Sequence, residues 1–240
     1  MGNDVNRICT IAVRGGSRGV PGKNWRMIAG QSLFAHSVRH ASESGLFEVI
    51  VVTSDAPEVL DVALSCGATH VVVRPAELAT DTAGKVPAIV HAVREMESLT
   101  GGRFDTVVDL DATSPLRTVG DIHSAVALLE GEGIESVVTA CEARRSPYFN
   151  LIEVDSQSGH VGVAKPLPQG ILRRQDAPKT FDMNASIYVW NRDAFLAEPR
   201  VFYPSTRIFE MPPERSLDID SEFDFEIVSW LMERNLPQNG

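Results

Sequence analysis

The sequence predicts a single α/β domain, residues 1–240, built on a mostly parallel sheet with helices on both faces. Three observations support this class. Strand-like and helical segments alternate through the first part of the chain, the strand-like segments are valine and isoleucine runs without polar alternation, and a glycine-rich loop follows the first of them. Such runs suit strands that are buried on both faces, and strand–helix–strand order favours parallel pairing with right-handed crossovers.

The elements are expected in a regular order. Apolar runs predict strands at 8–13, 49–53, 69–73, 106–110, 136–140 and 185–190, and helical patterns between the first five fall at 31–43, 57–66, 86–99 and 120–131. A last helix is expected near 221–234, where Ser221 and Asp224 form an approximate capping box. The apolar face expected of this helix carries Phe223, Ile227 and Leu231.

Residues 142–182 interrupt this alternation. The segment is rich in Arg, Pro, Gln and Gly and contains only two short extended pieces, at 149–154 and 160–164. A segment of about 40 residues rarely holds a hydrophobic core alone. We therefore expect an inserted dimerisation arm, not a separate domain, which gains its burial from a partner subunit.

The overall charge and the cysteines limit the class of protein. A formal net charge of −10 argues against a general nucleic-acid binder. The three cysteines, Cys9, Cys66 and Cys141, form no C-x-x-C pair, which indicates reduced thiols and a cytoplasmic protein. No run approaches about 18 apolar residues and the first residues are polar, so neither a membrane span nor a signal peptide is expected.

A glycine-rich, cationic loop at residues 14–24 follows the first expected strand. Glycines let the backbone turn tightly and direct successive N–H groups at an anion, and Arg14, Arg18 and Lys23 add positive charge. The loop is not a Walker A motif, because Ser17 and Asn24 stand where that motif needs Gly and Ser or Thr. It predicts a nucleotide-phosphate site of another kind, with a plain surface turn as the alternative.

Two Asp-x-Asp pairs lie at the ends of expected elements. Asp109 and Asp111 end the fourth strand, and Asp218 and Asp220 precede the last helix. Alternate side chains of an extended chain share a face, so the second pair would point one way while Ile219 faces the core. Oxygen ligands suit Mg²⁺, which takes one or two carboxylates together with waters and substrate phosphates. A helix-capping role for the second pair stays open.

Taken in order, these motifs resemble the acylneuraminate cytidylyltransferase family, the enzymes that make CMP-sialic acid and its bacterial relatives. The resemblance spans residues 8–232 and rests on the segments 12–24, 74–81, 113–117, 173–176, 184–186 and 218–225. It implies a Rossmann-like fold and a homodimer whose inserted arm reaches toward the neighbour's site. It also implies that the anomeric hydroxyl of an acidic nonulosonate sugar attacks CTP and releases pyrophosphate. The implied cofactor is Mg²⁺, for which Mn²⁺ could substitute.

The resemblance also implies roles for individual residues. Those expected to bind the nucleotide are Arg14, Gly15, Gly16, Ser17, Lys23, Asn24 and Arg74, and those expected to bind the metal are Asp218 and Asp220. The sugar would be bound by Arg173, Arg174, Gln175 and Asn184, and catalysis would involve Arg14, Lys23, Asp111 and Asp220. A solvated charge run or an interface pair is the alternative for the two adjacent arginines.

Two departures from the family pattern bear on the substrate. Asp111 stands where sialate enzymes often carry Gln and resembles the metal-binding Asp of deoxy-octulosonate cytidylyltransferases. Ala185 replaces the usual Gly after Asn184, which adds a methyl beside the sugar and favours a diacylated sugar such as legionaminic or pseudaminic acid. The alternatives are a deoxy-octulosonate cytidylyltransferase, a nucleotide-sugar glycosyltransferase using Asp-x-Asp, and an inactive dimeric binding protein.

Overall fold

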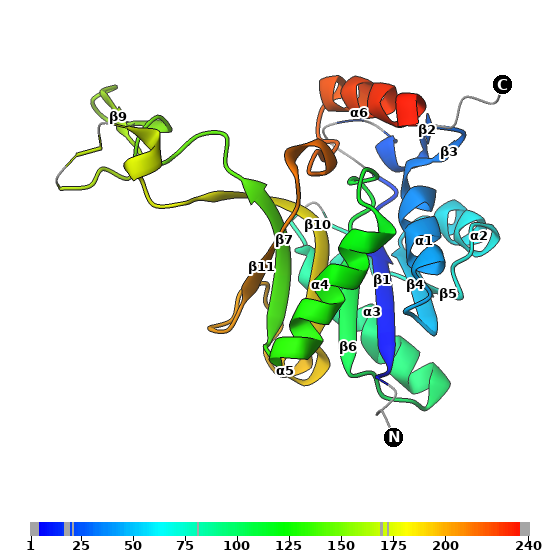
Figure 1. Ribbon diagram of the computed structural model, residues 1–240. Coiled ribbons are helices and arrows are strands. Elements are labelled where there is room, and N and C mark those ends of the chain that lie inside the picture. The colour runs from blue at the N-terminus through cyan, green and yellow to red at the C-terminus, as the bar shows by residue number, and fades with distance from the viewer. Residues whose placement is uncertain are drawn as a thin grey trace.

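The computed structural model describes residues 5–16, 20, 22–80, 82–168, 170–171 and 173–235. Seven strands form one sheet in the order β11–β7–β10–β6–β1–β4–β5, and all pairs are parallel except those that β10 makes with β6 and β7 (Figure 1). The predicted mostly parallel α/β fold is confirmed. The strands are β1 (Arg7–Ala12), β4 (Val49–Ser54), β5 (His70–Val73), β6 (Thr106–Leu110), β7 (Ser136–Glu142), β10 (Phe181–Asn191) and β11 (Arg207–Glu210).

Helices cover both faces of the sheet. Buried apolar residues join α1, α2 and α4 to one face and α3 and α5 to the other. Because side chains alternate along β6, Val108 and Leu110 face α1 and α4, whereas Val107 and Asp109 face the side covered by α3. The helices are α1 (Leu33–Ser44), α2 (Pro57–Ser65), α3 (Lys85–Thr100), α4 (Val119–Glu132), α5 (Arg192–Ala197) and α6 (Glu222–Asn235).

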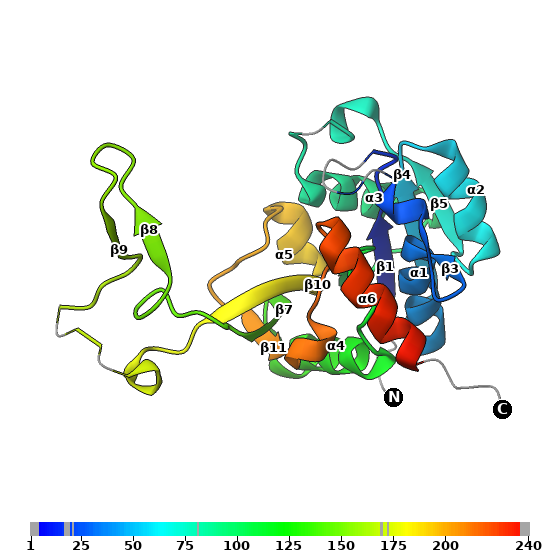
Figure 2. The ribbon, with the colours of Figure 1, turned by 90° about the horizontal axis from the view of Figure 1, so that it is seen from above.

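The last helix, α6, crosses over the carboxyl end of the sheet when the molecule is seen from above (Figure 2). Its predicted capping box is present: Asp224 Oδ2 accepts from the Ser221 N–H at 2.8 Å, and Ser221 Oγ accepts from the Asp224 N–H at 3.2 Å. Its predicted apolar face is wrong at Phe223, whereas Ile227 and Leu231 are partly buried as expected. Phe223 is 68% exposed, whereas Phe225 and Val228 are buried in a cluster with Ile28, Leu33 and Ile219. The helix faces that cluster, so residues three positions apart are buried.

The segment expected as an inserted arm projects away from the body of the molecule (Figures 1 and 2). β7 and β10 lead into it, and it contains the two-stranded hairpin of β8 (Ile152–Val154) and β9 (Val161–Val163). Ile152, Val154 and Val161 are 60%, 64% and 61% exposed, so this chain alone does not bury the apolar side chains of the hairpin.

Several short elements have no counterpart in the sequence prediction. They are α5, β11 and the pair β2 (Met27–Ile28) and β3 (Gln31–Ser32), all of which lack a periodic pattern of their own. Among the helices of the described residues, none combines the length and the apolar character that a bilayer crossing requires.

Candidate active site

A cavity of about 510 Å³ opens at the carboxyl ends of β1 and β6. This edge of a parallel sheet is where such folds bind ligands. The cavity brings together residues from segments far apart in the sequence, and most of the predicted nucleotide, metal and catalytic residues line it: Arg14, Gly16, Lys23, Asn24, Arg74, Asp111, Asp218 and Asp220. Ser17, which the motif also assigned to the nucleotide, lies outside the described residues, as does Arg18.

The glycine-rich loop is anchored to the body of the protein. Asn24 is buried and its Nδ2 donates to the Arg14 carbonyl oxygen at 3.0 Å. The Gly15 N–H donates to Asp55 Oδ1 at 3.0 Å, and a Cβ at Gly15 would lie 2.9 Å from that of Ala56. This close packing leaves no room for a side chain at position 15, and the Gly15 N–H is hydrogen-bonded to Asp55.

Lys23 joins the loop to the second acidic pair. It begins a 3₁₀ turn, Lys23–Trp25, directly after Gly22, whose φ of 64° favours glycine. Its ammonium donates to the Ile219 carbonyl oxygen at 2.5 Å and lies 3.2 Å from Asp220 Oδ1. The structure thus places the predicted phosphate-binding cation beside the predicted metal-binding carboxylates.

Asp218 and Asp220 both line the cavity, while Ile219 between them is fully buried, as the alternation of an extended chain predicts. The Ile219 N–H donates to the Thr113 carbonyl oxygen at 3.0 Å and holds the segment in place. Burial raises the pKa of Asp218, and the neighbouring Asp220 raises it further. Asp218 forms no ion pair with any described residue, so this negative charge lacks a cation.

These two carboxylates fit a magnesium ion. No cluster of three or more His, Cys, Asp or Glu side chains suited to a metal occurs in the described part of the chain. A pair of carboxylates beside a cavity large enough for a nucleotide matches the preference of Mg²⁺ for few protein oxygens plus substrate phosphates. The capping alternative is wrong for this pair, because the side chain that caps α6 is Ser221.

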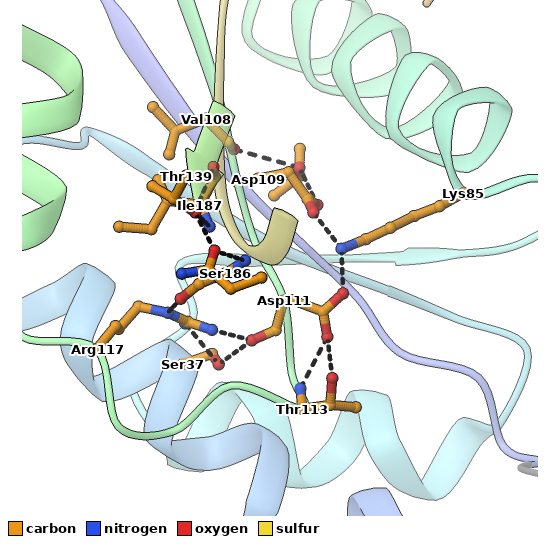
Figure 3. Close-up of polar contacts among 12 residues, drawn as sticks. Ser37, Lys85, Val108, Asp109, Asp111, Thr113, Arg117, Thr139, Ser186 and Ile187 are labelled. Atoms are coloured by element: carbon orange, nitrogen blue, oxygen red, sulfur yellow. Dashed lines mark hydrogen bonds and ion pairs between the residues drawn. The ribbon is translucent and has the colours of Figure 1, made fainter. Parts of the chain in front are cut away.

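The first acidic pair has a cation that the sequence reasoning missed. Lys85, the first residue of α3, places its ammonium 2.5 Å from Asp109 Oδ2 and 2.7 Å from Asp111 Oδ2 (Figure 3). Burial opposes ionisation of both Lys85 and Asp111, but their mutual attraction outweighs it, raising the pKa of Lys85 and lowering that of Asp111. Burial raises the pKa of Asp109, which is completely enclosed.

Two buried arginines support the cavity walls. Arg117, which ends the Thr-Ser-Pro-Leu-Arg element, donates to the Asp111 carbonyl oxygen and to the hydroxyls of Ser37 and Ser186 at 2.9 and 3.0 Å (Figure 3). Burial lowers the pKa of Arg117 to about 10. Arg74 donates to the Thr53 carbonyl oxygen at 2.9 Å while lining the cavity. Arg117 therefore positions the strand end that carries Asp111.

The predicted sugar residues of the arm lie outside this cavity. Arg173 pairs with Asp176 at 2.9 Å. Arg174 donates to the Ala143 carbonyl oxygen at 2.5 Å, and with Gln175 it borders a separate hollow of about 440 Å³ at the base of the arm. Within one chain the structure does not bring these three residues to the cavity.

Asn184 faces the protein interior instead of the cavity. It is buried, its Oδ1 accepts from Thr139 Oγ1 at 2.7 Å, and its Nδ2 donates to Ser216 Oγ at 2.9 Å. The next residue, Ala185, lines the cavity and has a φ of 52°, in the left-handed region that favours glycine. Asn184 therefore anchors the irregular part of β10, between Met183 and Tyr188, at which Ala185 lines the cavity.

The fold and this cavity define an α/β nucleotide-binding protein whose site combines a cationic glycine-rich loop with an acidic pair suited to magnesium. The chain belongs to the cytidylyltransferase family, whose pattern matches residues 8–229. It is thus a nucleotidyltransferase, and the glycosyltransferase alternative is set aside.

Similar proteins cover nearly the whole chain. A "Post-translational flagellin modification protein B" of Campylobacter coli is 43% identical over 95% of this chain and 96% of its own length. A "CMP-N,N'-diacetyllegionaminic acid synthase" of Campylobacter jejuni is 40% identical over 94% of both. The solved structure of a CMP:2-keto-3-deoxy-manno-octonic acid synthetase complexed with CTP superposes with a TM-score of 0.68 and 17% identity, covering 96% of this chain and 100% of that one. This likeness confirms the fold.

Proposed function

We propose that this protein transfers CMP from CTP to a nonulosonic acid and releases pyrophosphate. The observation that carries the proposal is that Lys23, Asp218 and Asp220 meet in one cavity of a cytidylyltransferase. The legionaminic acid synthase from Campylobacter jejuni, 40% identical over nearly its whole length, supports a diacylated nonulosonic acid as the sugar. The cytoplasm is the proposed location, resting on the three free cysteines.

In the proposed reaction the anomeric hydroxyl of the sugar attacks the α-phosphorus of CTP, and the bond from that phosphorus to pyrophosphate breaks. Arg14 and Lys23 neutralise the triphosphate, since both line the cavity at the phosphate loop. Nucleotidyl transfer gains most from such positioning and charge neutralisation. Asn24, held against the Arg14 carbonyl, keeps the loop in shape for this contact.

Asp218 and Asp220 would hold the Mg²⁺ ion, with Mn²⁺ as a substitute. When bound, the ion would supply charge stabilisation at the phosphate and lower the pKa of the attacking hydroxyl. The protein's own part is to hold both carboxylates at the cavity wall, which the buried Ile219 and its hydrogen bond to Thr113 support.

Ala185 bears on which sugar is accepted. Its left-handed backbone costs an alanine about 1 kcal/mol relative to glycine. A strained residue that lines a cavity suggests that its methyl has a function there. We assign that methyl to the pocket of the N-acyl groups.

An assay of pyrophosphate release with CTP and a panel of ulosonic acids tests the proposed function. We expect turnover with N,N'-diacetyllegionaminic or pseudaminic acid to exceed that with N-acetylneuraminate and with deoxy-octulosonate. Ala185→Gly should reduce this preference, because it removes the methyl that we assign to the N-acyl pocket, and it should leave the KM for CTP nearly unchanged. Absence of turnover with every nonulosonic acid would reject the function, and a clear preference for deoxy-octulosonate would establish the alternative.

We further propose that the arm forms a two-fold dimer and brings at least one of its basic residues toward the neighbour's sugar pocket. The exposed apolar side chains of β8 and β9 need a covering surface, and Arg173, Arg174 and Gln175 do not reach the cavity of their own chain. In an isologous dimer each arm serves the other subunit.

Mixing two inactive variants tests this exchange. Asp220→Asn removes one of the two proposed metal ligands, and Arg173→Ala removes an arm cation. An equal mixture should regain about a quarter of wild-type activity, because half of the dimers are mixed and each holds one intact site. Arg145→Ala, an arm cation outside the sugar motif, is the control and should stay active alone. No recovery despite demonstrated subunit exchange would mean that the arm serves only its own chain.

A further inference from the structure

The space between Asp109 and Asp111 is already filled by a cation of the protein. The Lys85 ammonium lies 2.5 Å from one carboxylate and 2.7 Å from the other (Figure 3). A divalent ion that bridged the same oxygens would occupy the same position, since Mg²⁺ binds carboxylates at about 2.0–2.1 Å. Lysine and metal therefore exclude one another there.

The other oxygens of this pair are also occupied. Asp109 Oδ1 accepts from Thr10 Oγ1 at 2.8 Å, and Asp111 Oδ1 accepts from the Thr113 N–H at 2.8 Å and from Thr113 Oγ1 at 2.7 Å. A metal ligand needs a lone pair directed at the cavity. Three of the four oxygens accept a hydrogen bond from the protein, and the fourth, Asp109 Oδ2, is in ion-pair contact with the Lys85 ammonium.

Lys85 cannot easily move aside. It begins the 16-residue helix α3, whose buried residues include Ile89 and Val93 and fix the helix against the sheet. Asp109 is fully buried, and a carboxylate so enclosed is costly without a paired cation. The second pair differs: the side chain of Asp220 is 76% exposed, and Asp218 has no ion pair among the described residues.

We infer that the Lys85 ammonium is a built-in cation that fills the site between Asp109 and Asp111 and confines divalent metal binding to Asp218 and Asp220. Asp111 is then a positioning residue, which fixes Lys85 and the Thr113 loop at the cavity wall, and is not a metal ligand. This inference rests on the proposed function, because it concerns the metal that accompanies CTP.

Mn²⁺ binding to the whole protein, followed by electron paramagnetic resonance with saturating CTP and no sugar, tests the inference. Asp111→Asn should keep the Mn²⁺ affinity within about threefold, whereas Asp220→Asn should weaken it at least about tenfold, as expected for loss of a ligand. Lys85→Met should bind one more ion per chain than the wild type, because the two carboxylates become available.

The outcomes separate the inference from the proposed function. The inference would be overturned if Asp111→Asn weakened the Mn²⁺ affinity as much as Asp220→Asn does. It would also be overturned if folded Lys85→Met bound the same number of Mn²⁺ ions per chain as the wild type. If Lys85→Met does not fold, the comparison of the two aspartate variants decides. A wild-type protein that binds no Mn²⁺ beyond that held by free CTP would instead refute the proposed function.

Discussion

Replacing Asp220 with asparagine is expected to leave the fold intact and to lower kcat/KM by about 100-fold or more, because a metal at a transferring phosphate is worth several kcal/mol of charge stabilisation. The Asp220 side chain is 76% exposed, and among the described residues it pairs only with Lys23, so little stability depends on it. Steady-state kinetics at ordinary Mg²⁺ concentration measures the loss. Raising the Mg²⁺ concentration should recover part of the activity, since one carboxylate of the pair remains.

The first turn of α6 offers a matched control. Glu222 pairs with Arg26 at the surface, carries the same charge as Asp220 and does not line the cavity. Glu222→Gln removes one negative charge nearby and should leave kcat/KM within about twofold. Equal losses in both variants would mean that general charge, and not a metal ligand, is responsible. Full wild-type activity in excess chelator would refute the metal site altogether.

Much of the fold follows from local sequence patterns. β1, β4 and β6 are largely buried on both faces and carry apolar runs such as residues 49–52, so their positions were predicted within about one residue. β10 begins at Phe181, before the predicted start at 185, because its first part is exposed and contains polar side chains. Short elements such as β11 are defined by their pairing with β7, which no local pattern records. The face of α6 was assigned wrongly because Phe223, Phe225, Ile227 and Val228 offer two apolar stripes, and only tertiary packing selects between them.

The sequence predicted those residues of the candidate site that belong to short motifs. The second acidic pair is recognisable in the sequence, because two aspartates alternate with an apolar residue directly before an expected helix. No local pattern links Lys85 to this site, because Lys85 lies 26 positions before Asp111 and on a different element. The available clue was charge: Asp109 and Asp111 on one face of a buried strand require a cation. Lys85, directly after Gly84 at the start of the preceding helix, was the candidate to test.

Replacing Lys23 with alanine is expected to lower kcat/KM roughly 30- to 700-fold, which corresponds to a loss of about 2–4 kcal/mol of transition-state stabilisation. This is the effect expected of a charge-assisted contact with the CTP phosphates that strengthens in the transition state. The ammonium donates to the Ile219 carbonyl oxygen and to Asp220 at the cavity wall, which is where the proposed function would bring the triphosphate and its metal together. Stability should fall by about 1–3 kcal/mol, because the carbonyl oxygen of the fully buried Ile219 loses its donor. Near-wild-type kinetics of Lys23→Ala would exclude a role for Lys23 in binding the CTP phosphates.

The ion pair between Lys23 and Asp220 gives this prediction a second measurement. If substrate binding turns the lysine to phosphate and the carboxylate to metal, their 3.2 Å contact opens during the reaction. The two residues then act on one charged centre, and their effects should not add. Lys23→Ala combined with Asp220→Asn should lose less than the product of the two single losses. Strict additivity would show independent roles. Arg103→Ala, at an exposed residue outside both the arm and this cavity, controls for the loss of one positive charge.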